Sequence, residues 1–206
     1  MSRGREAARL AARSFADDPF YQWLEPDASR RERLLVAIML RALATATVRT
    51  VPEVAATGDD APPLGLIAWH APDVRASGGG LAVGLVRLLR RPLRAWRALW
   101  FLRTLRKLRP RTPHVHVELL AVDARARGQG LARRLLEPLL EQASQAGLVI
   151  HLETTNPDNL PLYQRFGFTE VARIHGVPGR TPTAWAMQRS PGVGLAPHAR
   201  EASFTA

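Results

Sequence analysis

The stretch from His114 to Ala132, HVHVELLAVDARARGQGLA, constrains the fold of this 206-residue chain more than any other. Its first part, His114 to Val122, is rich in apolar and β-branched residues and ends at a turn, which predicts a buried strand. Leucines recur at three- and four-residue spacing from Leu131 onward, which predicts a helix ending at Gly147. Backbone amides at such a helix N-terminus point outward, and the helix dipole adds positive charge. The connecting loop is therefore predicted to bind an anion such as a pyrophosphate.

The loop itself contains two glycines and two arginines. Gly128 and Gly130 let the main chain approach phosphates closely, although a tight turn without a ligand would also use them. The dinucleotide fingerprint G-x-G-x-x-G and the P-loop ending Gly-Lys-Ser/Thr are both missing. The loop resembles the acyl-CoA pyrophosphate loop of the GNAT superfamily, R/Q-x-x-G-x-G/A. It fits in two registers, Arg125 with Gly128 and Gly130, or Arg127 with Gly130 and Ala132, and both place the same amides at the phosphates.

A second tract, from His151 to Phe168, extends the resemblance. Its sequence, HLETTNPDNLPLYQRFGF, has a strand, an Asn, and a short helix with a Tyr before Gly-Phe, as in GNAT proteins. Within the superfamily, both tracts are most similar to the puromycin N-acetyltransferase-like branch. The resemblance implies an α/β (α+β) GNAT fold, with a central mixed, mostly antiparallel sheet flanked by helices, and acetyl-CoA as acyl donor. The cofactor contacts it implies are Leu120, Ala121, Val122, Arg125, Arg127, Gly128, Gln129, Gly130, Leu131, Ala132 and Asn159.

The resemblance also implies catalytic roles for a few polar residues. Tyr163 stands where the family keeps its general acid, and a phenol suits a departing thiolate; the alternative is a packing role at a helix end. Strand alternation places His116 and Glu118 on one face, at positions where arylalkylamine acetyltransferases carry H-x-H-x-L-A-V. Glu118 is the first candidate for the general base and His116 the second. Glu153 is a third candidate and is also expected to bind the acceptor amine.

Covalent and metal chemistry are not expected. The chain has no cysteine and no serine in a nucleophile-elbow pattern, so acyl transfer is expected to be direct. His114 and His116 would need at least one more ligand to hold zinc, and no metal-binding motif is present. We therefore predict no metal site.

The N-terminal third is expected to supply the acceptor side. Helices are predicted over residues 3–15 and 28–45, and strands over 47–56 and 64–70. Between the helices, residues 20–24 form a predicted aromatic turn. In similar superfamily members an acceptor-binding wall lies here, which makes Phe20 and Trp23 candidate substrate-binding residues. The alternative is that both simply belong to the core.

The net charge of +11 is concentrated in one segment. Ten cations and no acidic residue lie between Arg87 and Arg111. The segment 81–111 is predicted to be a basic helical insertion, broken at Pro92, with Leu93, Trp96, Trp100, Leu105 and Leu108 as the apolar positions after the break. It is interpreted as a cover on the acceptor side, with an unspecialised surface pair or a peripheral membrane or nucleic-acid contact as alternatives.

The chain is thus predicted to be a single GNAT domain over residues 1–189 with a disordered tail over 190–206. We expect an acetyl-CoA-dependent N-acetyltransferase acting on a small-molecule primary amine. The alternatives are a protein or peptide acceptor, or a non-catalytic acyl-CoA-binding or basic nucleic-acid- or membrane-binding protein. With no signal peptide or membrane span recognisable, a cytoplasmic monomer or homodimer that binds no nucleic acid is expected.

Overall fold

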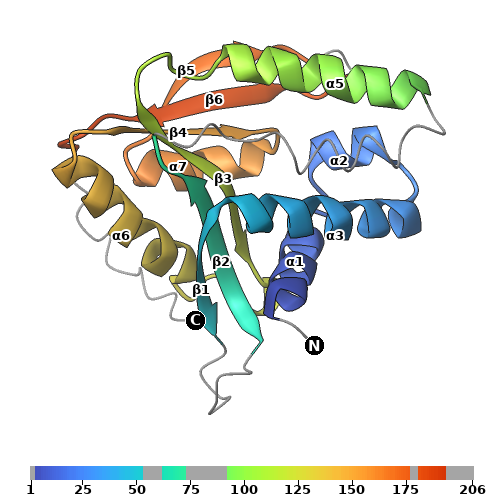
Figure 1. The fold of residues 1–206 in the computed structure, drawn as a ribbon, viewed down its shortest axis with the longest axis horizontal. Coiled ribbons are helices and arrows are strands. Elements are labelled where there is room, and N and C mark those ends of the chain that lie inside the picture. The colour runs from blue at the N-terminus through green and yellow to red at the C-terminus, as the bar shows by residue number, and fades with distance from the viewer. Residues whose placement is uncertain (1–2, 53–61, 73–91, 177–180, 194–206) are drawn as a thin grey trace, which may run out of the picture.

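A single six-stranded sheet forms the centre of the computed structural model, which describes residues 3–52, 62–72, 92–176 and 181–193 (Figure 1). The strand order is β1-β2-β3-β4-β6-β5. All neighbours are antiparallel except β3 and β4, which are parallel. The strands are β1 (Thr47–Pro52), β2 (Pro63–His70), β3 (His114–Val122), β4 (Val149–Thr154), β5 (Thr169–Ile174) and β6 (Ala184–Arg189). The predicted mixed, mostly antiparallel sheet is confirmed.

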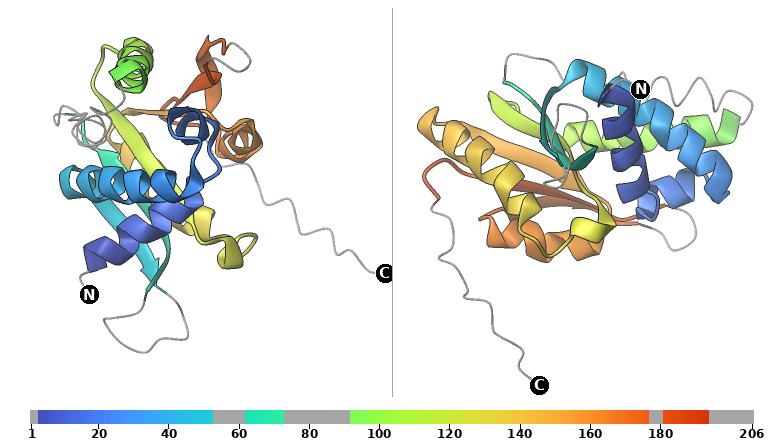
Figure 2. Two further views of the ribbon diagram at one scale, coloured as in Figure 1. Left: turned by 90° about the vertical axis from the view of Figure 1, so that its right-hand side faces the viewer. Right: turned by 90° about the horizontal axis from the view of Figure 1, so that it is seen from below.

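Helices cover both faces of this sheet. They are α1 (Arg3–Ser14), α2 (Pro19–Leu24), α3 (Ala28–Thr45), α5 (Pro92–Lys107), α6 (Leu131–Gln145) and α7 (Leu160–Arg165), with short 3-10 turns η1 (Ala124–Ala126) and η2 (Pro157–Asn159). Figure 2 shows α1–α3 gathered at one side of the molecule and α6 at the opposite side. The predicted bounds of α3 and the predicted start of α6 are confirmed, because strong local signals mark them: Asp27 caps α3 by accepting the Arg30 amide at 2.8 Å.

The apolar stripe of α6 packs on one face of the sheet. The helix runs without interruption through Pro138 and buries Leu131, Leu135, Leu136, Leu139, Leu140 and Ala143. These side chains pack against β2, β3 and β4 and against Tyr163 and Phe166 at α7. Each fully buried leucine contributes about 1.5–3 kcal/mol, so α6 is anchored firmly and its N-terminus is fixed relative to the sheet.

The opposite face of the sheet carries α1 and α3, which are tied to α2 by one buried arginine. Arg31 donates to the carbonyls of Ala16, Glu25 and Pro26 at 2.7–2.9 Å. The predicted aromatic turn at residues 20–24 was wrong: the segment is the helix α2. Asp18 accepts the Phe20 amide and Pro19 occupies the first helical turn, a combination that starts a helix rather than a turn.

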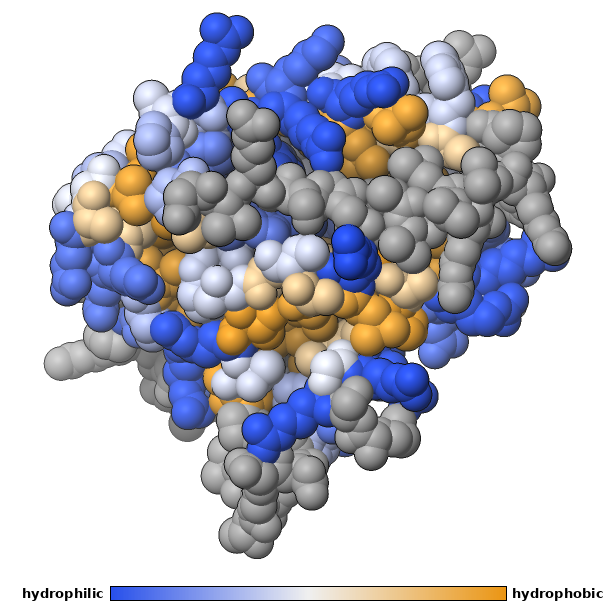
Figure 3. Space-filling view, in the orientation of Figure 1, coloured by the Kyte–Doolittle hydropathy of each residue, from blue (hydrophilic) through white to orange (hydrophobic). Residues whose placement is uncertain are grey.

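Helix α5 begins at Pro92, as expected, but only part of its predicted apolar set packs inward, and that part includes Leu105. Ala98 and Phe101 are fully buried against α2 and the start of β6, whereas Leu93, Trp96 and Trp100 are exposed. The helix is apolar on more than one side, so its sequence did not decide which side would pack inward. In the space-filling view, hydrophilic and hydrophobic residues lie next to each other along the edge where α5 runs (Figure 3).

A bulge in β3 changes the orientation of its side chains. Ala68 of β2 pairs with Leu119 and Trp69 pairs with Val117, which leaves Glu118 as an extra residue. Before the bulge, Val115 and Val117 face α6. After it, Leu119 and Ala121 face α1 and α3 instead, while Leu120 and Val122 face α6. The strand therefore switches phase at Glu118.

Several predictions fall on residues outside those that the structure describes. These are the end of the first strand (53–56), the first half of the basic insertion (81–91) and most of the tail (194–206). Within the described ranges, none of the helices is both long and apolar enough to cross a membrane.

Candidate active site

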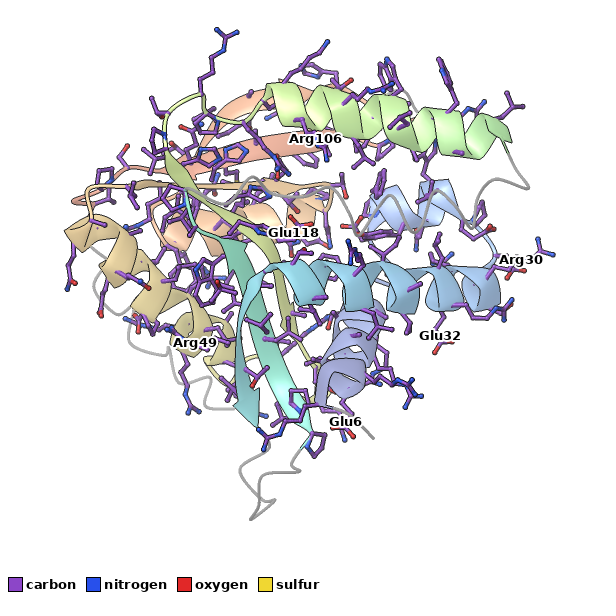
Figure 4. All side chains as sticks on the ribbon, in the orientation of Figure 1. Glu6, Arg30, Glu32, Arg49, Arg106 and Glu118 are labelled. Atoms are coloured by element: carbon purple, nitrogen blue, oxygen red, sulfur yellow. The ribbon has the colours of Figure 1, made fainter. Side chains whose placement is uncertain are left out.

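The sheet opens where the pairing between its two parallel strands stops. The last β3–β4 pair is Val117 with Leu152, and the next residues on the two strands are Glu118 and Glu153. Beyond this point β3 pairs only with β2, and β4 only with β6. A cleft of about 1240 Å³ begins at this opening and extends to the N-terminus of α6. In Figure 4, Glu118 lies near the centre of the molecule, between α3 and α5.

The loop before α6 lines one end of the cleft. Gly128 and Gly130 have φ angles of 78° and 73°, a left-handed conformation that favours glycine. The first intrahelical bond of α6 runs from the Arg134 amide to the Gly130 carbonyl, and the amides of Leu131 and Ala132 before it have no acceptor within the helix. The predicted residues that line this end are Leu120, Val122, Arg127, Gly128, Gly130, Leu131, Ala132 and Asn159.

Three predicted cofactor contacts are not among the lining residues. Arg125 binds Asp123 through both its Nε and NH2 atoms, at 3.0 and 3.2 Å. The side chain of Gln129 donates to the Arg125 carbonyl at 3.2 Å. Ala121 is buried beneath α1 because of the bulge in β3. Of the two motif registers, the one with Arg127, Gly130 and Ala132 places all three of its residues at the cleft.

Tyr163 lies in the middle of the cleft wall, on α7. Its ring packs edge-on against Phe168 with centroids 5.8 Å apart, and the residue is only 8% exposed. Burial, with a smaller contribution from the charge of Asp18, raises the pKa of Tyr163 to about 12. The phenol therefore remains protonated at neutral pH.

Three buried histidines lie side by side across β2, β3 and β4. His70 pairs with His116, and His116 pairs with His151, so the three rings lie on neighbouring strands in register. The rings of His70 and His116 stack with centroids 6.3 Å apart, and those of His116 and His151 with centroids 5.8 Å apart. Only His116 of the three reaches the cleft. The pairing of these strands thus places three histidine side chains next to one another.

Two carboxylates and one guanidinium surround this row. Nε2 of His116 lies 3.4 Å from Glu118 Oε2 and 3.5 Å from Glu153 Oε2. Arg109 donates from Nε to Glu153 Oε1 at 2.9 Å. Burial opposes ionisation of Glu153, but the proximity of His116, His151 and Arg109 outweighs it and lowers its pKa to about 2. Burial likewise opposes ionisation of Glu118, yet hydrogen bonds from His116 and His70 keep its pKa well below the usual range.

The residues that build this cleft lie in the part of the chain that identifies its family. The model of the acetyltransferase (GNAT) family matches residues 15–168, which include the loop before α6, the β3–β4 opening and Tyr163. The chain belongs to the acetyltransferase (GNAT) family. Enzymes of this family use acetyl-CoA as their acyl donor.

Similar proteins cover only part of this GNAT chain in sequence but most of it in structure. An acetyltransferase of Agrobacterium fabrum is 34% identical over 36% of the chain and 56% of its own length, so the match spans about half of that relative. The solved structure of a histone acetyltransferase HPA2 and related acetyltransferase from Corynebacterium glutamicum has a TM-score of 0.62 at 20% identity, covering 94% of this chain and 93% of that one. Arylalkylamine N-acetyltransferase 2 from Aedes aegypti has a TM-score of 0.54 at 16% identity, covering 92% and 96%. At these identities the two structures show that the fold is shared.

The far end of the cleft in this GNAT chain is largely apolar. Phe20 of α2 stacks on Phe101 of α5, with centroids 5.1 Å apart and an interplanar angle of 19°. Phe20, Tyr21, Phe101, Leu102 and Leu105 line this end, next to Glu118 and Glu153. The predicted substrate-binding residue Trp23 packs behind Phe20 and Phe101 and is not among the lining residues. Helix α5, in the described half of the basic insertion, thus contributes lining residues to this end, and the role of the whole insertion as a cover stays a prediction.

Sequence reasoning missed several residues that build the site. His70, His151 and Arg109 meet at the site only through strand pairing and through the return of the chain after α5, neither of which a local pattern reveals. Asp18 is also in the cleft wall, where it accepts hydrogen bonds from the Phe20 amide at 2.9 Å and from Thr155 Oγ1 at 2.6 Å. Burial raises the pKa of Asp18 despite these bonds. The Asp-Pro pair before α2 was the one local signal available, since it is typical of a helix N-cap.

Proposed function

We propose that this protein is an acetyl-CoA-dependent N-acetyltransferase that acetylates a small, partly apolar primary amine. The observation that carries the proposal is the composition of one continuous cleft. It has the N-terminus of α6 at one end, two largely buried carboxylates beside aromatic residues at the other, and Tyr163 in its wall. The first end suits a pyrophosphate and the second suits a cationic amine with an apolar substituent.

The donor is proposed to lie along the opening between β3 and β4. Its pyrophosphate would bind the amides of the Gly128–Ala132 segment, with Arg127 nearby. Its pantetheine arm would pair with the edge of β3 at Leu120 and Val122, which β4 leaves unpaired. Asn159 also lines this path, and its side chain is held by Thr154 at 3.2 Å.

The acceptor amine is proposed to enter at Glu118 and Glu153. An ammonium group is attracted to these carboxylates, and its substituent would contact Phe20, Phe101 and Leu102. Of the three candidate bases we favour His116, which reverses the preference drawn from the sequence. An imidazole is the side chain whose ordinary pKa lies near neutral pH, and His116 Nε2 lies within 3.5 Å of both carboxylates, which stabilise it once protonated.

The chemical step then needs no covalent enzyme intermediate. The ammonium gives a proton to His116, and the neutral nitrogen attacks the thioester carbonyl. The carbon–sulfur bond breaks, and Tyr163 donates its phenolic proton to the departing thiolate of CoA. The nitrogen loses its second proton as the amide forms, and that proton restores the phenol of Tyr163. Because Tyr163 is protonated at all neutral pH values, it is ready to act as the acid in every cycle.

Support for a small-amine acceptor comes only from the pocket of this chain. The names of the two structural neighbours differ in this respect, since one is a histone acetyltransferase and the other an arylalkylamine N-acetyltransferase. The aromatic wall and the narrow polar end fit an arylalkylamine better than an extended peptide. Membership of the puromycin N-acetyltransferase-like branch remains a prediction from the two sequence tracts.

The proposal is tested by following CoA release with arylalkylamines, aminonucleosides, polar amines and a lysine-containing peptide as acceptors. Turnover is expected with an apolar primary amine, and Tyr163→Phe should lower kcat about 100-fold while acetyl-CoA affinity is kept. Phe101→Ala should raise KM for the best amine, whereas Trp96→Ala, an exposed residue of the same helix, should not. Turnover of the peptide alone would refute the small-molecule acceptor, and full activity of Tyr163→Phe would remove it as the acid.

A further inference from the structure

Buried histidine nitrogens without a partner are concentrated beside the acceptor end of the cleft. Among the described residues, the buried side-chain nitrogens that lack a hydrogen-bond partner include Nδ1 of His70, Nδ1 of His116, and both ring nitrogens of His151. His151 is fully buried, and its Nε2 lies 3.3 Å from Glu153 Oε1 without the alignment of a hydrogen bond. A buried polar group is normally satisfied by protein, water or an ion, so His151 requires an explanation.

Two of these histidines, His116 and His151, direct Nε2 toward one carboxylate. His116, His151 and Glu153 each offer one ligand atom, and these atoms all lie within 4.8 Å of one another. Nε2 of His116 is 3.5 Å from Glu153 Oε2 and Nε2 of His151 is 3.3 Å from Glu153 Oε1. Two donors bound 2.0–2.1 Å from a tetrahedral zinc ion are about 3.3 Å apart. The separation between His116 Nε2 and Glu153 Oε2 is therefore already close to that of a metal site, and the ligand atom of His151 lies within 4.8 Å of both partners.

We propose that His116, His151 and Glu153 form a binding site for a divalent transition metal such as Zn²⁺. Two imidazoles and one carboxylate are a common protein ligand set for such ions, and a further position is left for water or another ligand. His116 and Glu153 line the cleft, so the site can be reached from solvent, whereas His151 lies behind them. No metal site was expected from the sequence because His114 and His116 lacked a further ligand. The parallel pairing of β3 with β4 supplies two.

Charge and surrounding contacts agree with a cation at this point. With neutral histidines, Glu118, Glu153 and Arg109 together carry a net charge of −1, which a metal ion would compensate. Arg109 donates to Oε1 of Glu153, which leaves Oε2 for a metal. Residues that are not ligands themselves commonly orient a metal-binding carboxylate in this way. His114 packs edge-on against His151, with centroids 5.8 Å apart, and limits the movement of its ring.

Metal binding at this site would regulate the proposed reaction. The ion would occupy the position of the acceptor ammonium at Glu153 and would engage the imidazole proposed as the base. Inhibition by Zn²⁺ competitive with the amine is therefore expected, and this consequence rests on the proposed function. The metal site itself does not, since it is defined by three side chains and can be measured without acetyl-CoA or an acceptor.

The test is calorimetric titration of the metal-free protein with ZnCl₂, with the matched variants His151→Gln and His70→Gln. Both residues are buried histidines whose rings stack near His116, but His70 lies outside the ligand set. One Zn²⁺ per chain with micromolar affinity or better is expected. His151→Gln should weaken binding by about tenfold or more, and His70→Gln should leave it within about threefold. No binding to the wild-type protein, or equal effects of the two variants, would overturn the proposal.

A second measurement covers the case in which His151→Gln does not fold. X-ray absorption of the wild-type protein loaded with one equivalent of Zn²⁺ should show two imidazole ligands with nitrogen or oxygen donors at about 2.0–2.1 Å. A spectrum with one imidazole or none would mean that the ion binds elsewhere. If the wild-type protein transfers acetyl groups but does not bind zinc, the metal site alone is refuted. If it binds zinc but transfers no acetyl group, the proposed function alone is refuted.

Discussion

The protonation of Tyr163 makes the stability of this protein depend on pH in a predictable way. The chain has two tyrosines, and the buried Tyr163 has a pKa of about 12 in the folded state. In the unfolded chain the same phenol ionises near pH 10. The folded state thus favours the neutral form, so this contribution to stability is fully present below pH 10 and is lost as the pH rises from 10 to 12. A difference of two pKa units corresponds to about 2.7 kcal/mol.

The comparison that isolates this effect is between the wild-type protein and Tyr163→Phe, each unfolded with urea at pH values from 8 to 11.5. By pH 11.5 the wild-type protein should have lost about 1.9 kcal/mol more of its free energy of unfolding than the variant. The native wild-type protein should also show little tyrosinate absorbance at pH 11, and absorbance should appear on unfolding. Burial and the charges of Asp18 and Glu118 also raise the pKa of Tyr21, but Tyr21 is present in both proteins and its effect cancels.

Parallel stability curves for the two proteins would refute this reasoning. They would mean that Tyr163 ionises equally easily in the folded and unfolded states, and hence that its phenol is not held in a buried environment. The proposed general acid would then lose part of its activity on the alkaline side well below pH 12. A pH profile of kcat would show that loss directly.

Two further substitutions test the cofactor loop and the N-terminal helices. Gly128→Asp and Gly192→Asp both place a side chain at a φ of 78° with no atom within 4 Å of the new Cβ, so both should destabilise the fold by a similar amount, about 1 kcal/mol. Only Gly128→Asp should reduce acetyl-CoA affinity, by about tenfold or more in calorimetry, because its carboxylate would face the pyrophosphate; equal affinities would mean that the loop does not hold the phosphates. Arg31→Met should lower the free energy of unfolding by about 2–4 kcal/mol in urea denaturation, because three backbone carbonyls lose their donor. A loss below about 1 kcal/mol would show that Arg31 does not hold the three helices together.

The elements with strong local signals were predicted well from the sequence. The nine residues of β3 and the leucine pattern of α6 gave the correct bounds because both are long and regular. Asp27 marked the start of α3 for the same reason, since an N-cap is a local interaction. The cleft residues Gly128 and Tyr163 were found because they belong to short motifs.

The remaining features depend on contacts between distant parts of the chain. His151 reaches His116 because β4 is parallel to β3 in one particular register, which no pattern within either strand specifies. The position of Arg109 depends on the path that the chain takes between α5 and β3. The buried side of α5 was predicted only in part, because tertiary packing turned Phe101 and Leu105 inward but left Trp96 exposed.

The extra residue in β3 has a consequence for how this strand can change in evolution. Up to Val117 the strand presents polar side chains toward the acceptor, and from Leu119 onward it presents apolar ones toward α1 and α3. Deleting Glu118 would restore regular pairing with β2 and would leave the side chains before and after it on their present faces, so the chain would lose the carboxylate but not the register. Removing any other single residue of the strand would instead turn the side chains on one side of it to the opposite face, whereas loops accept such changes readily. Glu118 is therefore the one residue of β3 that evolution could gain or lose, together with its carboxylate, without turning either half of the strand.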